Sequence, residues 1–472
     1  MHILSATAGG FVDEAAGVVR VEQEPAEIVV LSAADTTLSL LAAACQRLPE
    51  TFPSVRLCNL MHLRQPASVD LYVDEVLTHA RVIVVDHLGG RSYWPYGTER
   101  LVALARERKQ SLIMFSGDRT EDPSLLREST ASPAQCRQLW RYLRESGPEN
   151  AREFFHFIGR EFLGRADIAR PPRVIPDPVV YSPQHGIGGI DECKSRWQPG
   201  APVVALVFYR AHLAAGNTAV FDELIASLER RGLNPLPIAL GSLKDPLALQ
   251  VLQQLCAGHD AALILNTTAF ATAALDEPQF RPLAGDLPVI QVMLSGGNRE
   301  NWRDNHHGLN PRDVAMQVAL PEVDGRIISR VVSFKGKTYR CERTQFEVSQ
   351  YQADLERIEF VAELARRWCR LRALTNSEKR VALILANYPA RDGRIGNGVG
   401  LDTPASVISI LRLLQARGYL LERVPADGDA LLAALLQGVT NDADTRDARW
   451  ARQSLSLETY RRFYAGLPEE CR

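Results

Sequence analysis

The sequence predicts an α/β protein made of tandem doubly wound parallel-sheet units, flavodoxin-like or periplasmic-binding-like, with long helices and an incomplete last unit. Short apolar runs alternate with amphipathic segments along most of the chain. Apolar runs of this kind are typical of strands that are buried on both faces of a parallel sheet. The alternation breaks off at a proline-rich stretch and then begins again, so we expect more than one such unit.

Residues 1–165 form the first predicted domain. Its apolar runs are EIVVLS, SVRLCNL, RVIVVDH and SLIMFSG, and an amphipathic segment follows each of them. The stretch RPPRVIPDPVVYSPQHGIGG comes next, and its prolines fix φ and withhold backbone donors from a strand ladder. We therefore expect residues 166–200 to be an irregular connector.

A second domain is predicted over residues 201–340, followed by a long helical segment over 341–375 and the start of a third domain over 376–472. The second domain repeats the alternation with the runs PVVALVFYR, NPLPIAL, AALILNTT and LPVIQVML. The third offers only two predicted strands, KRVALILANYP and YLLERVP. Two strands cannot bury both faces of a sheet. We expect this last domain to be truncated, or to be completed by a partner.

Charge and cysteine content narrow the function classes. The chain has 472 residues and a formal net charge of −2, which argues against nucleic acid or an anionic membrane surface as a partner. No apolar run approaches the roughly 20 residues that span a bilayer. The 8 cysteines show no paired zinc or thioredoxin-like spacing, so we expect reduced thiols in a cytoplasmic protein.

The glycine-rich stretch IGNGVGLDTPAS, residues 395–406, lies between a predicted strand and a predicted helix. A dinucleotide fingerprint that begins at Gly396 would need a third glycine where Leu401 stands, and no lysine follows these glycines as a phosphate loop requires. Asp402 or Thr403 is predicted to cap the helix instead, with Pro404 in its first turn. The sequence does not support nucleotide binding here, and a structural turn and a binding loop both stay open.

Six segments, in order, resemble one known family. They are VVDHLGGRSYWPYG (84–97), FYRAHLAAGNTAVFDELI (208–225), NTTAF (266–270), VIQVMLSGGNRE (289–300), VALPEVDGRIISRVVSFKG (318–336) and ANYPARDGRIGNGVGLDTPAS (386–406). They are similar to the family that contains the CobN-type large subunit of aerobic cobaltochelatases and the H subunit of magnesium chelatases. FYRAHLAAGN and RIGNGVGLDTPAS look more like the cobalt branch.

The resemblance implies a tetrapyrrole-binding subunit that inserts Co²⁺, as a substrate, into hydrogenobyrinic acid a,c-diamide. It also implies two smaller AAA+-like partner subunits, of the CobS and CobT types, which use ATP and Mg²⁺ that this chain does not bind. Members of the family are well over twice this length, so the chain resembles an N-terminal part that is not active alone. The alternatives are a non-catalytic tetrapyrrole-binding or assembly module and a magnesium-chelatase H-type subunit.

Arginine suits the acidic side chains of such a substrate, because its planar fork pairs with carboxylates. Arg210 stands at a predicted strand end, where ligands of open α/β sheets bind, and His212 and Asn217 follow it. Arg394 and Asn397 hold the corresponding place in the third unit. We expect these five residues to bind substrate, and the two loops to face one cleft. A capped, hydrogen-bonded loop is the competing interpretation.

Four acidic or imidazole side chains complete the candidates. Glu322 and Asp324 in PEVDGR are candidates for holding the metal, although a helix-ending turn at Gly325 explains the motif as well. Asp86 and His87 end a predicted strand and are candidates for a substrate-facing rim, or for a buried hydrogen-bonded pair. No residue is predicted to be catalytic.

Overall fold

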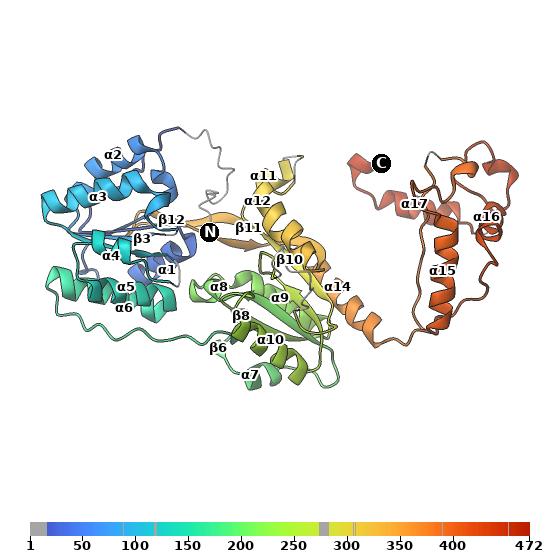
Figure 1. Ribbon diagram of the computed structural model, residues 1–472, viewed down its shortest axis with the longest axis horizontal. Helices are drawn as coiled ribbons and strands as arrows, with labels where there is room; N and C mark the ends of the chain where they lie inside the picture. The colour runs from blue at the N-terminus through green and yellow to red at the C-terminus, as the bar shows by residue number, and fades with distance from the viewer. Residues whose placement is uncertain are drawn as a thin grey trace. The chain divides into compact units, whose positions relative to one another are not determined.

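The computed structural model describes residues 17–87, 89–117, 120–272, 283–304, 306, 308–388, 390–451 and 453–472. The chain divides into two compact units, Met1–Cys369 and Arg370–Arg472. The first unit holds two sheets of four and eight strands, each covered by helices (Figure 1). The protein is therefore a mixed α/β protein with parallel sheets.

The first sheet is entirely parallel and has the order β2-β1-β3-β4. Its strands are β1 (Ile28–Ser32), β2 (Val55–Asn59), β3 (Val82–His87) and β4 (Ser111–Ser116). Successive residues of each strand enter two different cores: Val30 lies in one core with Leu139, while Leu31 lies in the other with Leu101. Both faces of the sheet are therefore buried, which is why its strands read as continuous apolar runs.

Proline marks the start of most helices around this sheet. The helices are α1 (Asp35–Gln46), α2 (Pro66–Glu75), α3 (Pro95–Arg108), α4 (Pro123–Glu128), α5 (Pro133–Glu145) and α6 (Pro148–Leu163). A proline in the first turn loses no hydrogen bond, because the first N–H groups of a helix have no partner within the helix. The prolines that follow the strands therefore start helices rather than break them.

The second sheet is mixed and has the order β12-β11-β10-β9-β7-β8-β5-β6. Its strands are β5 (Val179–Ser182), β6 (Gly186–Gly188), β7 (Val203–Tyr209), β8 (Asn234–Leu240), β9 (Ala261–Asn266), β10 (Val289–Ser295), β11 (Ile327–Cys341) and β12 (Phe346–Ala353). The neighbouring strands from β8 to β11 pair in parallel, and the pairs at the two edges, β8–β5, β5–β6 and β11–β12, are antiparallel.

The helices of this part differ widely in length. They are α7 (Ile190–Lys194), α8 (Arg210–Ala214), α9 (Ala219–Arg230), α10 (Pro246–Gly258), α11 (Arg299–Asp304), α12 (Pro311–Val314), α13 (Leu320–Val323) and α14 (Leu355–Ala373). A π-helical turn, Ala315–Ala319, joins α12 to α13. Helix α14 packs Ile358, Val361 and Ala365 against the same core as α9.

The prediction of an irregular connector over 166–200 is wrong at its centre, because β5, β6 and α7 lie there. Strand β5 pairs antiparallel with the edge of β8. Pro178 directly precedes β5 and Pro183 directly follows it, so neither proline interrupts the ladder. Proline is tolerated at the limits of an edge strand, where no ladder donor is needed.

The predicted long helix over 341–375 is wrong in its first part, where β12 runs beside β11 as a long hairpin. The two strands extend from the second sheet toward the first (Figure 1). At the far end Cys341, Phe346 and Val348 join the core of the first sheet. Leu57 N donates to Thr344 O at 3.3 Å. The hairpin therefore ties the two sheets together, and pairing with β11 outweighs the polar composition of β12.

The second unit contains α15 (Thr403–Ala416), α16 (Gly428–Leu436) and α17 (Leu457–Ala465), and no strand among its described residues. The predicted strands KRVALILANYP and YLLERVP are therefore wrong. Ile384 is 93% exposed and Leu420 is 80% exposed. An apolar run without a neighbouring strand has no ladder to join, so composition alone does not make it a strand.

The capping prediction in this unit is confirmed. The Asp402 carboxylate accepts from Ala405 N at 3.0 Å, and proline follows in the first turn of α15. Gly396 and Gly400 have φ values of 72° and 74°, which glycine adopts without strain. The glycine-rich loop is therefore a turn that leads into a capped helix.

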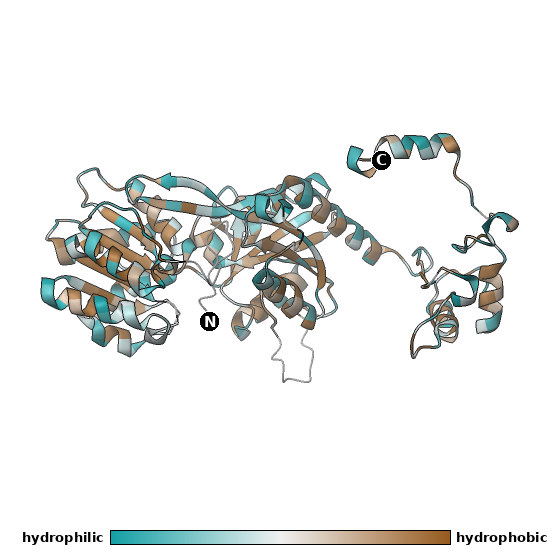
Figure 2. Ribbon diagram, turned by 90° about the horizontal axis from the view of Figure 1, so that it is seen from above, coloured by the Kyte–Doolittle hydropathy of each residue, from teal (hydrophilic) through white to brown (hydrophobic). Residues whose placement is uncertain are grey.

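Hydrophobic residues are concentrated in the strands of the first unit (Figure 2). None of the helices in the described part of the chain is both long and apolar enough to cross a membrane.

Candidate functional site: a basic cleft between two sheets

A cavity of about 800 Å³ lies between the two sheets of the first unit, and we call it the basic cleft. Residues at or shortly after strand ends line both of its walls. Thr36 and Gly117 come after β1 and β4, and Tyr209 and Gly241 come at the ends of β7 and β8. The carboxyl ends of two parallel sheets thus border one cavity, which is the usual ligand position in open α/β sheets.

The lining of the basic cleft carries an excess of positive charge. Arg144, Arg210 and Lys244 line it, and Asp245 is its one acidic lining residue in the described part of the chain. The Asp245 carboxylate accepts from Leu247 N at 2.9 Å and caps α10. The acidic partners of Arg144 and Arg210, Asp86 and Asp177, lie outside the lining, so the lining itself presents basic groups that suit a ligand with carboxylates.

Arg210 is buried at the start of α8 and lines the cleft as a strand-end residue. Its Nη1 donates to Ile175 O at 2.7 Å, and its Nε lies 3.9 Å from Asp177 Oδ2. Both partners belong to the segment that leads into β5. Arg210 is therefore held by the proline-rich stretch that the sequence suggested was a simple connector.

His212 also lines the cleft and is only 8% exposed. Its ring packs against Phe221 and Tyr351, with centroids 5.3 Å and 5.4 Å away. Burial lowers the pKa of His212 to about 4, and the positive charge of Lys335 contributes in the same direction. Its buried Nδ1 has no hydrogen-bond partner among the described residues. His212 is therefore neutral near pH 7.

Asn217 lies outside the lining of the basic cleft, unlike Arg210 and His212. Its Oδ1 accepts from Tyr351 N at 3.2 Å, and it is not among the described residues that line the cleft. The asparagine therefore holds β12 behind His212. Its predicted role in binding substrate stays a prediction.

Asp86 and His87 end β3 beneath the cleft. The Asp86 carboxylate is 2% exposed and accepts from Ser32 Oγ at 2.8 Å and from Arg144 Nη2 at 2.6 Å. His87 is fully buried, and its ring centroid lies 6.1 Å from that of Trp94. Asp86 therefore lies behind Arg144, and the predicted place of Asp86 and His87 at a substrate-facing rim stays a prediction.

Arg394 and Asn397 are exposed residues of the second unit, in and after the short 3₁₀ helix Asp392–Arg394. Beside them Asp392 accepts hydrogen bonds from Thr440 Oγ1 at 2.6 Å and Thr445 Oγ1 at 3.0 Å. The Thr440 bond is the main reason why the pKa of Asp392 is lowered. Asp392 thus anchors the loop, while the predicted meeting of this loop with Arg210 in one cleft stays a prediction.

The motif PEVDGR forms a turn that closes α13. Gly325 has φ 68°, and its N–H donates to Glu322 O at 2.9 Å. Asp324 is buried and accepts from Arg326 Nη2 at 2.6 Å and from Thr272 N at 2.8 Å. Glu322 is exposed. No group of three or more metal-ligating side chains was found in the part of the chain that the structure describes, so the metal role of this pair stays a prediction.

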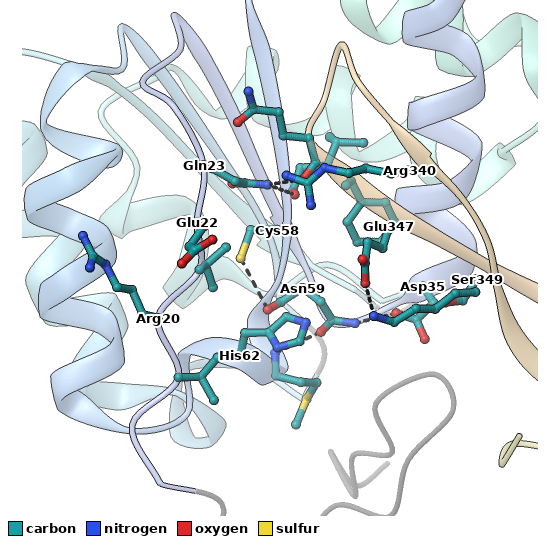
Figure 3. A pocket seen from close by; sticks show the side chains of 17 residues that line it. Arg20, Glu22, Gln23, Asp35, Cys58, Asn59, His62, Arg340, Glu347 and Ser349 are labelled. Carbon is teal, nitrogen blue, oxygen red and sulfur yellow. Dashed lines mark hydrogen bonds and ion pairs between the residues drawn. The ribbon is translucent and has the colours of Figure 1, made fainter. Parts of the chain in front are cut away.

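A second cavity, of about 500 Å³, lies where the β11–β12 hairpin meets the first sheet, and we call it the hairpin pocket (Figure 3). Arg20, Lys337 and Arg340 contribute positive charge to it. Three acidic residues, Glu22, Asp35 and Glu347, match them. Burial lowers the pKa of His62 at its wall. The charges of the hairpin pocket balance, so it does not favour an anion.

The comparisons with known proteins agree with this architecture. Residues 140–472 match the family model described as CobN/Magnesium Chelatase. The chain belongs to this family. It is 49% identical, over its whole length, to aerobic cobaltochelatase subunit CobN of Pseudomonas aeruginosa, and covers 38% of that protein. It is 38% identical to the same subunit of Sinorhizobium sp., also over its whole length, and covers 37% of that protein.

A solved structure of a family member has a similar fold. It is the catalytic subunit of cobaltochelatase from Mycobacterium tuberculosis, matched with 30% identity and a TM-score of 0.61. The match covers 94% of this chain and 35% of that one. The chain thus spans little more than a third of the length of these relatives.

Proposed function

We propose that the chain is the N-terminal part of the large, tetrapyrrole-binding subunit of an ATP-dependent cobaltochelatase. The whole enzyme would insert Co²⁺ into hydrogenobyrinic acid a,c-diamide during aerobic cobalamin synthesis. The observation that carries the proposal is the 49% identity to a CobN subunit across the entire chain. Magnesium-chelatase H subunits are more distant relatives, so a magnesium enzyme is the weaker alternative.

The basic cleft is the proposed site for the acidic side chains of the substrate. Arg210 supplies a guanidinium fork there, and His212 supplies a neutral ring nitrogen. Arg394 and Asn397 of the second unit are likewise proposed to bind the substrate. Asn217, Asp86 and His87 would support the cleft from behind.

Co²⁺ is proposed to be a substrate of the complex, with Glu322 as its candidate contact on this chain, because Asp324 is already paired with Arg326. The partners are proposed to be two AAA+-like subunits of the CobS and CobT types. They would bind ATP and Mg²⁺, which fits a chain whose glycine-rich loop lacks phosphate-binding spacing. A tetrapyrrole-binding or assembly module without a part in metal insertion is the second candidate.

The two sheets are proposed to be doubly wound units. The order β2-β1-β3-β4 in the first sheet and the order β8-β7-β9-β10-β11 in the second support this assignment, because each places its first strand inside the sheet. The predicted domain limit at 165 is proposed to mark the end of the first of these units, whereas the limit at 340 falls inside β11, which pairs with β12 in the same sheet.

An absorbance titration tests the binding proposal. Hydrogenobyrinic acid a,c-diamide is added to the chain while the main absorbance band of the macrocycle is followed. Saturable binding at micromolar concentration is expected. No spectral change at tens of micromolar would contradict tetrapyrrole binding by this chain. Adding both smaller subunits, Co²⁺ and ATP then tests metal insertion, which is expected only when the rest of the large subunit is supplied.

A further inference from the structure

Arg144 is a residue of the basic cleft that the sequence did not single out. It lies in the last turn of α5, far along the chain from any strand end, and its side chain is 17% exposed. It lines the first-sheet wall, whereas Arg210 lines the wall formed by the second sheet. The cleft therefore has one guanidinium on each wall.

The guanidinium of Arg144 is held from behind by the first sheet. Its Nη2 donates to Asp86 Oδ1 at 2.6 Å, and its Nη1 donates to the carbonyl of Gly117. Asp86 is in turn fixed by Ser32 Oγ at 2.8 Å. A buried carboxylate with two partners leaves the arginine little freedom, so its orientation is set before a ligand arrives.

The described residues leave some hydrogen-bond donors of Arg144 unused. A guanidinium has five N–H donors, and the two bonds to Asp86 and Gly117 use only two of them. The Nε of Arg144 is buried and has no acceptor among the described residues. The Nε atom is closed to the cleft as well, so a ligand there would accept from the second N–H of Nη1 or Nη2.

The backbone beside Arg144 is also unusual. Ser146, which lines the same cleft, has φ 63° and ψ −168°, a region that is populated almost only by glycine. Strained backbone of this kind is found preferentially at ligand sites. The turn that ends α5 therefore holds Arg144 and Ser146 at the wall of the cavity at some cost to stability.

We propose that Arg144 binds a carboxylate of the tetrapyrrole on the first-sheet wall while Arg210 binds another on the opposite wall. This inference rests on the proposed function. Asp86 is then a positioning residue that aims Arg144, not a substrate ligand. The cleft recognises a ligand with at least two carboxylates that are far enough apart to reach both walls.

The test is a titration of four proteins with hydrogenobyrinic acid a,c-diamide: the unchanged chain, Arg144→Ala, Arg144→Lys and Arg141→Ala. Arg141 is an exposed arginine of the same helix, so its variant is the matched control. We expect Arg144→Ala to raise Kd at least 10-fold, since it removes a charge-assisted contact. Arg144→Lys keeps the charge without the fork and is expected to fall between the two. Arg141→Ala is expected to change Kd less than twofold.

A second ligand distinguishes loss of carboxylate binding from a folding defect of the Arg144→Ala variant. The same macrocycle with its carboxylates converted to methyl esters is titrated against the unchanged chain and Arg144→Ala. We expect weak binding that is equal in the two proteins. Circular dichroism and thermal unfolding check that Arg144→Ala is folded.

Asp86→Asn tests the positioning role. It keeps the size of the side chain but removes the charge that holds Arg144, so we expect Kd to rise three- to tenfold. The effect should vanish in the Arg144→Ala background, because there is then no arginine to position. Additive losses in the double variant would contradict the positioning role.

The outcomes show whether the role of Arg144 or the proposed function itself is wrong. If the unchanged chain binds the tetrapyrrole and Arg144→Ala binds it equally well, the role of Arg144 is wrong while the proposed function stands. If the unchanged chain does not bind at all, the proposed function itself fails. Equal loss of the acid and the ester by a folded Arg144→Ala protein would show that Arg144 shapes the cleft without binding a carboxylate.

Discussion

The basic cleft and the hairpin pocket both border strand ends of the first unit, yet they differ in how their charges are used. In the hairpin pocket Lys337 pairs with Glu347, and both residues line the cavity. In the basic cleft the acidic partners, Asp86 and Asp177, lie behind the two arginines. Charges that pair across a cavity close it to ions, whereas charges that are anchored from behind stay directed into it.

The largest expected effect is on tetrapyrrole binding, which should depend on the basic cleft and not on the hairpin pocket. The double variant Arg144→Ala/Arg210→Ala removes the guanidinium group from each wall of the basic cleft. It is expected to weaken tetrapyrrole binding at least 100-fold, because two charge-assisted contacts are worth about 3–6 kcal/mol. The matched double variant Arg20→Ala/Arg340→Ala removes as much charge from the hairpin pocket. Its Kd is expected to stay within twofold in the same titration. Similar losses in the two double variants would mean that net charge, not the cleft, attracts the ligand.

The hairpin that separates the two cavities gives the next effect. Phe346 is 9% exposed and packs in the core of the first sheet, although it belongs to the second. Phe346→Ala is expected to lower the free energy of unfolding by about 3–4 kcal/mol, the usual cost of an emptied aromatic site. Chemical denaturation measures it. Tyr339→Ala, a change on β11 at a 37% exposed residue, is the control and should cost about 1 kcal/mol or less.

Each cavity has a histidine at its wall, so the two cavities can also be compared by how the free energy of unfolding depends on pH. The pKa of His212 is lowered to about 4 in the folded chain, while an unfolded histidine titrates near 6.5. The unfolded chain therefore binds the extra proton first, and stability falls as the pH drops from about 6.5 to 4. Below pH 4 the loss amounts to about 3 kcal/mol. Above pH 6.5 His212 contributes no pH dependence.

His212→Gln removes the titrating group, so its unfolding free energy should fall less between pH 6.5 and 4 than that of the unchanged chain. His62→Gln in the hairpin pocket is the matched variant. Burial also lowers the pKa of His62, but nearby Asp35 opposes that shift, so its variant should change the pH profile less. Profiles that are parallel for the unchanged chain and His212→Gln would show that His212 is not held neutral.

The strands of the two sheets could be predicted because each is apolar on both faces, but their limits depended on pairing. The stretch around Val180 reads as a loop because of its prolines, yet it lies along the edge of β8. The run around Ile384 reads as a strand, yet the described part of the second unit offers no strand for it to pair with. Composition reports what a segment can bury, and only the neighbouring strands decide whether it is buried.

The candidate site could be predicted in part for a similar reason. Arg210 and His212 follow a strand directly, and the rule for parallel sheets places such residues at a ligand site. Arg144 ends a helix, and its approach to Asp86 follows from how α5 packs on the sheet, which no local pattern encodes. The nearest signal was the sequence Ser146-Gly147-Pro148, whose turn chemistry marks a change of direction beside the cleft.

The smallest expected effect concerns the strain at that turn. Ser146→Gly places glycine where φ is 63°, so the free energy of unfolding should rise by about 1 kcal/mol despite the greater freedom of glycine in the unfolded chain. Ser132 caps the other end of α5 at φ −64°, with its hydroxyl accepting from Gln135 N. Ser132→Gly is thus the control and should lower stability by a few tenths of a kcal/mol. Thermal unfolding of the two variants measures these opposite signs. If Ser146→Gly also weakens tetrapyrrole binding two- to threefold, the strained turn contributes to aiming Arg144, and unchanged binding would assign the strain to chain geometry alone.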